Sequence, residues 1–216
     1  MLDLELETMI SQQLVGHGVT NERVLNVFRR VPRRLFAPDY LEHKAYADVE
    51  LPIGLGQTIS PPYIIARMLQ ELAPLAEGRV LEIGTGSGFV TALLSGLCAQ
   101  VYTVEYLPEL AARARKTLLT QMGLTNIHFH VGDGFYGWSD KAPFDAIIVD
   151  AAALMVPDPL IGQLRPGGRL VMPIGEREQR LHVIERIDIM EEKTTILPEN
   201  QFVGHLLKLE GDADED

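Results

Sequence analysis

The chain has 216 residues, 46% of them hydrophobic, which suits one domain of ordinary size. Its net charge of −11 makes it a poor candidate for binding nucleic acid backbones. The final stretch EGDADED, residues 210–216, is so acidic that we expect a solvated tail there.

The single cysteine, Cys98, excludes a disulfide within the chain, and a zinc site would need other ligands. The start MLDLELETMI is acidic and lacks the basic segment of a signal peptide. No apolar run approaches the length of a membrane span. These features predict a cytoplasmic protein that holds no metal and binds no membrane.

Helical spacing of apolar residues predicts helices over 3–17 and 20–30. Two arginine pairs follow closely, Arg29-Arg30 and Arg33-Arg34, and we expect them to form an exposed basic patch on a helix and turn.

The stretch LPIGLGQTISPPY, residues 51–63, combines glycine-rich turns with a short polar core and precedes a helix that reaches Pro74. Ser60 is a good candidate for the N-cap of that helix, with Pro61 at its first position. These roles explain neither the glycines nor the Gln57-Thr58 pair, so a further role for the loop 44–60 is expected.

From residue 79 onward, short apolar runs alternate with amphipathic segments, which predicts an α/β fold with a doubly wound, mostly parallel Rossmann-like sheet. The predicted strands are 79–84, 100–105, 126–133, 143–153 and 169–175. Two final strands, within 180–190 and near 201–210, are expected to form an antiparallel pair. The expected single domain comprises N-terminal helices and a covering loop (1–77), a cofactor-binding core (78–176), the strand pair (177–209) and the tail (210–216).

The segment VLEIGTGSGFVTALL, residues 80–94, places three glycines between the first core strand and the next helix. Such glycines allow a sharp turn and a close approach by a ligand, and the helix N-terminus adds partial positive charge. Glu105 ends the second strand, where a carboxylate can accept hydrogen bonds from both ribose hydroxyls. Asp133, after the third strand, is placed to accept from an adenine amino group. The order of these features predicts a nucleoside ligand.

The glycine spacing and Glu82 are similar to motif I of S-adenosylmethionine-dependent methyltransferases, and a dinucleotide dehydrogenase is the weaker match. With GQTIS, the GDG of 132–134, PFDAIIVDAAA and LRPGGRLVMPIGE, the chain resembles the protein-L-isoaspartate O-methyltransferase family over residues 20–177. The resemblance implies methyl transfer from S-adenosylmethionine to the α-carboxylate of L-isoaspartyl residues in age-damaged proteins, which releases S-adenosylhomocysteine and starts their repair. Such a carboxylate is ionised at neutral pH, so no general base is needed.

The resemblance also implies site residues. It assigns Thr58 and Ser60 hydroxyls near the reacting centre, on a loop that closes over the methyl donor. The implied cofactor-binding set is Gln57, Thr58, Ile59, Ser60, Glu82, Gly84, Thr85, Gly86, Ser87, Glu105, Asp133 and Gly134. The implied substrate-binding set is Ile59, Ser60, Pro61, Tyr63, Asp150, Ala151 and Val203.

Two segments depart from the family pattern. Asp150 stands where the family usually has threonine, and Gln201–His205 replaces the usual Arg-Phe-Val-Pro-Leu. Alternative readings are therefore a relative that methylates another carboxylate or a dedicated peptide partner, and a non-catalytic module that binds S-adenosylmethionine. His128 and His130 have no third ligand nearby and are expected to be ordinary core or surface residues, whereas Trp138 suits either the adenine end or the core equally.

Overall fold

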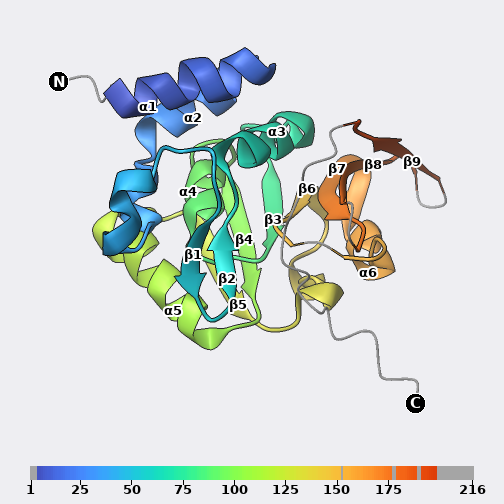
Figure 1. The fold of residues 1–216 in the computed structure, drawn as a ribbon. Coiled ribbons are helices and arrows are strands. Elements are labelled where there is room, and N and C mark those ends of the chain that lie inside the picture. Colours follow the sequence, from blue (N-terminus) through green and yellow to red (C-terminus); the bar gives the residue numbers. More distant parts are fainter. Residues whose placement is uncertain (1–3, 152, 177–178, 189–190, 199–216) are drawn as a thin grey trace.

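The computed structural model describes residues 4–151, 153–176, 179–188 and 191–198, and in this part of the chain the main sheet has seven strands in the order β5-β4-β3-β6-β7-β8-β9 (Figure 1). The strands β3 to β7 pair in parallel, whereas β7–β8 and β8–β9 are antiparallel. Their bounds are β3 Arg79–Ile83, β4 Gln100–Glu105, β5 Ile127–Val131, β6 Phe144–Val149, β7 Leu164–Ile174, β8 Arg180–Arg186 and β9 Glu192–Ile196. The predicted mostly parallel α/β sheet is confirmed.

The helices lie where the apolar periodicity predicts them, although several end in π or 3₁₀ turns. The α-helices are α1 Leu4–Thr8, α2 Glu22–Arg30, α3 Pro62–Leu72, α4 Phe89–Ser95, α5 Pro108–Arg115 and α6 Asp158–Gly162. The π-helical turns Met9–Leu14 and Lys116–Gln121 continue α1 and α5, and 3₁₀ turns occur at Val15–His17, Arg33–Phe36, Asp39–Lys44, Gly134–Tyr136 and Ser139–Lys141.

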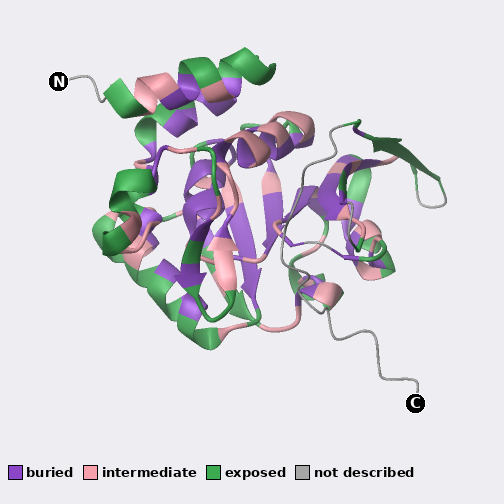
Figure 2. Ribbon diagram, viewed as in Figure 1, coloured by how far each residue is buried: buried purple, intermediate pink, exposed green. Residues whose placement is uncertain are grey.

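The central strands of the sheet are buried on both faces. One face packs on the N-terminal helices, α3, α4 and α5 through residues such as Val80 and Val101. The opposite face, which carries Leu81 and Ile147, packs with Leu160 of α6 and with Trp138. Figure 2 shows the central strands as buried and β9 as exposed. Burial on both faces explains why these strands are continuous apolar runs.

The covering segment, for which only a loop is predicted from the sequence, contains a β-hairpin. Strands β1 (Leu51–Gly54) and β2 (Gln57–Ile59) pair antiparallel, with Leu51 opposite Ile59. The turn between them has positive φ at Gly54, Leu55 and Gly56, a backbone conformation that favours glycine. The glycines therefore close a hairpin.

The C-terminal pairing differs from the expected one. Strand β8 lies between β7 and β9, so its antiparallel partners are these two strands. The expected partner near 201–210 lies outside the described residues. Strand β9 was missed because Glu192–Ile196 is exposed throughout and has no apolar alternation that would signal a strand.

Candidate active site

The glycine loop leaves the carboxyl end of β3 and comes very close to the end of β6. Gly84 has φ +93°, and a Cβ atom added there would lie 3.2 Å from the main-chain oxygen of Asp150. Only glycine combines this backbone conformation with so close an approach. Ligands of open α/β sheets bind in the crevice at the carboxyl ends of the strands, where this loop lies.

Glu105, at the end of β4, holds the glycine loop through backbone hydrogen bonds. Its buried carboxylate accepts from the N–H of Gly86 at 2.8 Å and from the N–H of Leu107 at 2.9 Å. Each carboxylate oxygen has a second lone pair, so both can still accept from ribose hydroxyls. The residues present therefore fit the nucleoside of S-adenosylmethionine, and Glu105 is already fixed in orientation.

Glu82 lies beneath the loop and is fully buried. Its Oε2 accepts from the Thr91 hydroxyl of α4 at 2.6 Å, and its Oε1 has no hydrogen-bond partner within the described residues. Beside it, the hydroxyls of Thr85 and Thr103 are 2.5 Å apart. Burial raises the pKa of Glu82 to about 8, so the carboxyl stays protonated at neutral pH. Glu82 therefore has no exposed surface and is anchored to α4 through Thr91.

The β5 end provides the third part of the crevice. Asp133 Oδ1 accepts from the N–H of Phe135 at 2.9 Å and so caps the short turn that begins at Gly134. A Cβ atom at Gly134 would lie 2.3 Å from Ile83 Cγ2, so no larger residue fits there. Trp138 stacks on His130 with ring centroids 5.0 Å apart and belongs to the core beneath this turn. That packing favours the core reading of Trp138.

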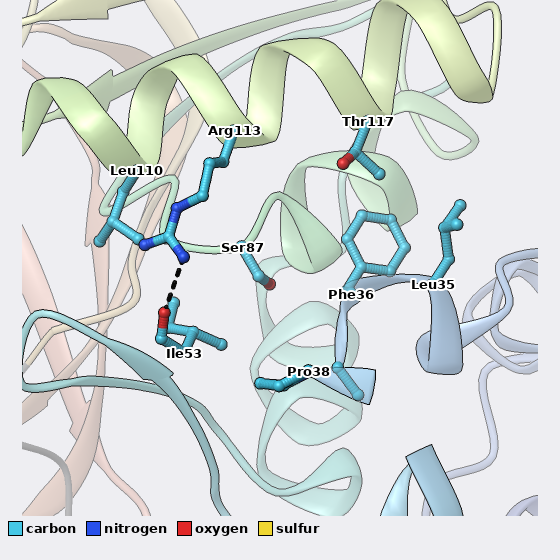
Figure 3. Close-up of a pocket in the computed structure, with 10 residues that line it drawn as sticks. Leu35, Phe36, Pro38, Ile53, Ser87, Leu110, Arg113 and Thr117 are labelled. Carbon is cyan, nitrogen blue, oxygen red and sulfur yellow. Dashed lines mark hydrogen bonds between the residues drawn. The ribbon is translucent and has the colours of Figure 1, made fainter. Parts of the chain in front are cut away.

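The β1–β2 hairpin is held beside the glycine loop by α5. Arg113 Nη1 donates to the main-chain oxygen of Ile53 at 3.0 Å, and a Cβ atom at Gly86 would lie 3.7 Å from Ile53 Cδ1. A cavity of about 210 Å³ lies next to this contact. Figure 3 shows Ser87 and Arg113 pointing into it from the glycine loop and from α5. Arg113 therefore helps to hold the hairpin beside the glycine loop, a role that the periodicity of helix α5 could not predict.

Ser60 does not cap helix α3, so that expectation was wrong. The cap position is Pro61 and the first helical residue is Pro62, while Asp48 Oδ1 accepts from the N–H of Tyr63 in the first turn at 3.0 Å. The Ser60 hydroxyl instead donates to Asp150 Oδ1 at 3.0 Å, although the two residues lie 90 positions apart in the chain. The two consecutive prolines shift the helix start by one residue and leave the hydroxyl free to reach β6.

Arg33 contradicts the expected exposed basic patch, because it is fully buried. Its guanidinium donates to the main-chain oxygens of Ala45 at 2.7 Å, of Val49 at 3.2 Å and of Ser60 at 2.9 Å. Desolvation lowers the pKa of Arg33 to about 10, and the charge of Asp48 opposes this effect. One side chain thus ties together both ends of the covering segment. The sequence signal for this buried role was the position of Arg33 within VPRRLF, in the N-terminal part of the region that resembles the family.

The other predicted residues lie on the same segments. Gln57 and Thr58 are half-buried on β2, and Ile59 is buried. Ala151, after β6, is buried, and the ring of Tyr63 packs against His17 at 5.4 Å. Pro61 is half-buried, whereas Val203 lies outside the described residues. The structure thus brings Ser60, Gly84 and Asp150 together.

The described residues include neither a metal-binding cluster nor a membrane-spanning helix. In the described ranges, no group of three or more His, Cys, Asp or Glu side chains could hold a metal ion. His128 instead stacks on Tyr102 at 4.6 Å and bonds Gln100. Among these residues, too, every helix is too short or too polar to cross a membrane.

A mostly parallel seven-stranded sheet with an antiparallel β8, a glycine loop after β3 and a fixed carboxylate at the end of β4 is typical of the Rossmann-like methyltransferase class. The family model described as "Protein-L-isoaspartate(D-aspartate) O-methyltransferase (PCMT)" matches residues 5–206. The chain belongs to this protein-L-isoaspartate O-methyltransferase family.

Individual relatives agree with this assignment. The protein-L-isoaspartate O-methyltransferase of Anaeromyxobacter dehalogenans strain 2CP-C is 51% identical over 188 residues, which cover 85% of this chain and 90% of the relative. That of Cellvibrio japonicus is 47% identical over 210 residues, or 95% of this chain and 93% of the relative.

Solved structures show the same fold. A protein-L-isoaspartate O-methyltransferase superposes with a TM-score of 0.81 at 26% identity, over 94% of this chain and 67% of that one. A Plasmodium falciparum protein of this type, solved in complex with S-adenosyl-L-homocysteine, gives a TM-score of 0.75 at 22% identity over 88% of this chain and 93% of that one. At that identity, the second likeness concerns the fold alone.

Proposed function

We propose that this protein transfers a methyl group from S-adenosylmethionine to the α-carboxylate of L-isoaspartyl residues in damaged proteins, which starts their repair. The observation that carries the proposal is the hydrogen bond from Ser60 to Asp150. It joins the family-specific GQTIS segment to the end of β6, so that covering segment and crevice form one site in a chain of this family.

The proposed methyl transfer needs no acid or base group from the protein. When bound, S-adenosylmethionine supplies an electrophilic methyl group on a positively charged sulfur. The acceptor carboxylate is ionised at pH 7, so the side chains need only align it and exclude water. The absence of a nucleophile–histidine pair in the proposed site residues agrees with this requirement.

We assign roles along the crevice. Glu105 takes the ribose hydroxyls, Asp133 and Gly134 border the adenine, and the backbone of Gly84, Thr85, Gly86 and Ser87 surrounds the donor. Glu82 supports this loop from beneath. Thr58 and Ser60 orient the reacting groups from the covering segment, with Asp150 and Ala151 opposite them. The support for these roles is positional, since the side chains lie at adjoining strand ends.

The proposed partners are aged proteins and peptides that carry L-isoaspartyl residues, and neither nucleic acid nor a metal takes part. The net charge of −11 supports the exclusion of nucleic acid. We place this activity in the cytoplasm, which suits a chain whose single cysteine, Cys98, is buried and free.

A repair assay tests the proposal. An isoaspartyl peptide is incubated with the protein, with and without S-adenosylmethionine, and the peptide isomers are separated over time. The proposal predicts donor-dependent loss of the isoaspartyl form and accumulation of succinimide and normal aspartyl peptide. An isomer ratio that does not respond to the donor would count against it.

A further inference from the structure

Asp150 is a carboxyl group in the part of the crevice that we assign to the anionic acceptor. It follows β6 and accepts from the Ser60 hydroxyl at 3.0 Å. Within the described part of the chain, no arginine, lysine or histidine forms an ion pair with it. Its hydrogen bond therefore comes from a neutral group, and its charge is not neutralised by a cation.

The groups from the neighbouring elements do not compensate a second negative charge. On β3, the neighbouring strand, Glu82 is protonated at neutral pH and brings no positive charge to a second carboxylate. The other neighbour, β7, ends in the apolar residues Met172–Ile174. The covering segment contributes the Ser60 hydroxyl, and Arg33 on that side donates to the main-chain oxygen of Ser60.

We propose that Asp150 is a specificity-determining residue that must carry a proton for the isoaspartyl carboxylate to bind, so that the two carboxyl groups share one proton and acceptor affinity falls as the pH rises. This inference rests on the proposed function and adds a regulatory property to the same site. Two carboxylates that share a site cannot both ionise readily, so one of them retains its proton.

The protonation behaviour of Asp150 suits this role. Burial raises its pKa to about 6, an effect that the Ser60 hydrogen bond partly opposes. Asp150 is thus mostly ionised at pH 7.5 and mostly protonated at pH 5, whereas the acceptor carboxylate is ionised at both values. A proton has to be taken up when the acceptor binds near neutral pH.

The shared proton is not consumed in the transfer. The acceptor oxygen forms a bond to the methyl carbon while the bond from that carbon to sulfur breaks, and its electron pair stays on sulfur. The acceptor becomes a neutral ester, and Asp150 can release its proton to water. The pair thus favours binding of the anionic substrate at low pH and does not hold the neutral product.

Calorimetry on the full chain saturated with S-adenosylhomocysteine tests the inference without turnover. An isoaspartyl peptide is titrated at pH 5.5, 6.5 and 7.5, and proton uptake is measured at pH 7.5 from buffers of different ionisation enthalpy. A peptide with the α-carboxylate replaced by a carboxamide serves as the neutral control. The proteins are the native chain, Asp150→Asn, and Glu192→Gln on exposed β9 as the charge-matched control.

For the native chain and Glu192→Gln, we expect the peptide Kd to rise toward the limit of roughly tenfold per pH unit above pH 6, with uptake of about one proton. Asp150→Asn and the carboxamide peptide should show neither effect. A pH-independent native Kd without proton uptake, or an unchanged pH slope in Asp150→Asn, would overturn the inference. The proton-uptake measurement uses only the native chain, so it tests the inference even if the variant does not fold. Failure of the proposed function would look different, since neither peptide would bind at any pH.

Discussion

Arg33 and Asp150 are linked through Ser60. Arg33 Nη2 donates to the main-chain oxygen of Ser60 at 2.9 Å, and the Ser60 hydroxyl donates to Asp150 Oδ1 at 3.0 Å. A residue of the N-terminal region thereby fixes the covering segment against the end of β6. The position of Ser60 depends on contacts from two parts of the chain that are distant in sequence.

Arg33→Lys should destabilise the protein, because an ammonium group cannot reach all the carbonyl oxygens that the buried guanidinium serves. We expect a loss of about 1–3 kcal/mol in the free energy of unfolding, measured by urea denaturation. The exposed Arg30→Lys is the matched control and should unfold like the native chain. Equal stability of both variants would mean that the Arg33 contacts contribute little.

Ser60→Ala should lower turnover on an isoaspartyl peptide by about tenfold or more while leaving S-adenosylhomocysteine affinity nearly unchanged, because an orienting hydroxyl acts in the aligned reacting complex. Removal of its hydrogen bond should also raise the pKa of Asp150 further. The pH at which acceptor affinity declines should therefore move upward. Kinetics across pH and calorimetry check both effects, and a loss of thermal stability alone would make Ser60 structural.

Glu105→Ala should weaken cofactor binding by about 1–3 kcal/mol, because the ribose hydroxyls and two backbone N–H groups lose a charged acceptor. Glu105→Gln keeps one acceptor oxygen and should fall between the native chain and the alanine variant. Calorimetric titration with S-adenosylhomocysteine measures the series. Native affinity in both variants would remove Glu105 from the site.

Glu82→Gln should stabilise the protein increasingly as the pH rises. Burial raises the native pKa from 4.5 to about 8, so between these values the unfolded chain loses a proton that the folded chain keeps. The native chain therefore loses stability with rising pH, by at most about 1.4 kcal/mol per pH unit, whereas glutamine does not titrate. Urea unfolding at pH 5, 6.5 and 8 should show a widening difference, and a constant difference would contradict the assigned protonation state.

The core of the fold could be predicted because its signals are local. The strand at Gln100–Glu105 has the predicted bounds, and the glycines at 84 and 86 fall between β3 and α4 as expected. Parallel strands buried on both faces show as apolar runs, and each helix shows its own periodicity. These patterns need only neighbouring residues to be recognised.

The contacts within the site could not be predicted from the sequence, because they join residues that are far apart in the chain. Nothing near Ser60 indicates that its hydroxyl binds Asp150 rather than the helix end. Arg33 looks like a surface cation until the carbonyl oxygens of the covering segment surround it. Turn glycines at 54 and 56 marked the hairpin only indirectly, because its strands are short. The side chains that position the covering segment were thus the least predictable from sequence.

Labelled methyl transfer to a matched pair of peptides, identical except for isoaspartate or aspartate at one position, tests the central claim most directly. Reactions with labelled S-adenosylmethionine are quenched in acid, and base-labile methyl ester is counted for each peptide. The proposed function predicts ester on the isoaspartyl peptide and none above background on the aspartyl peptide. Equal labelling of both peptides, or no ester on either one, would contradict it.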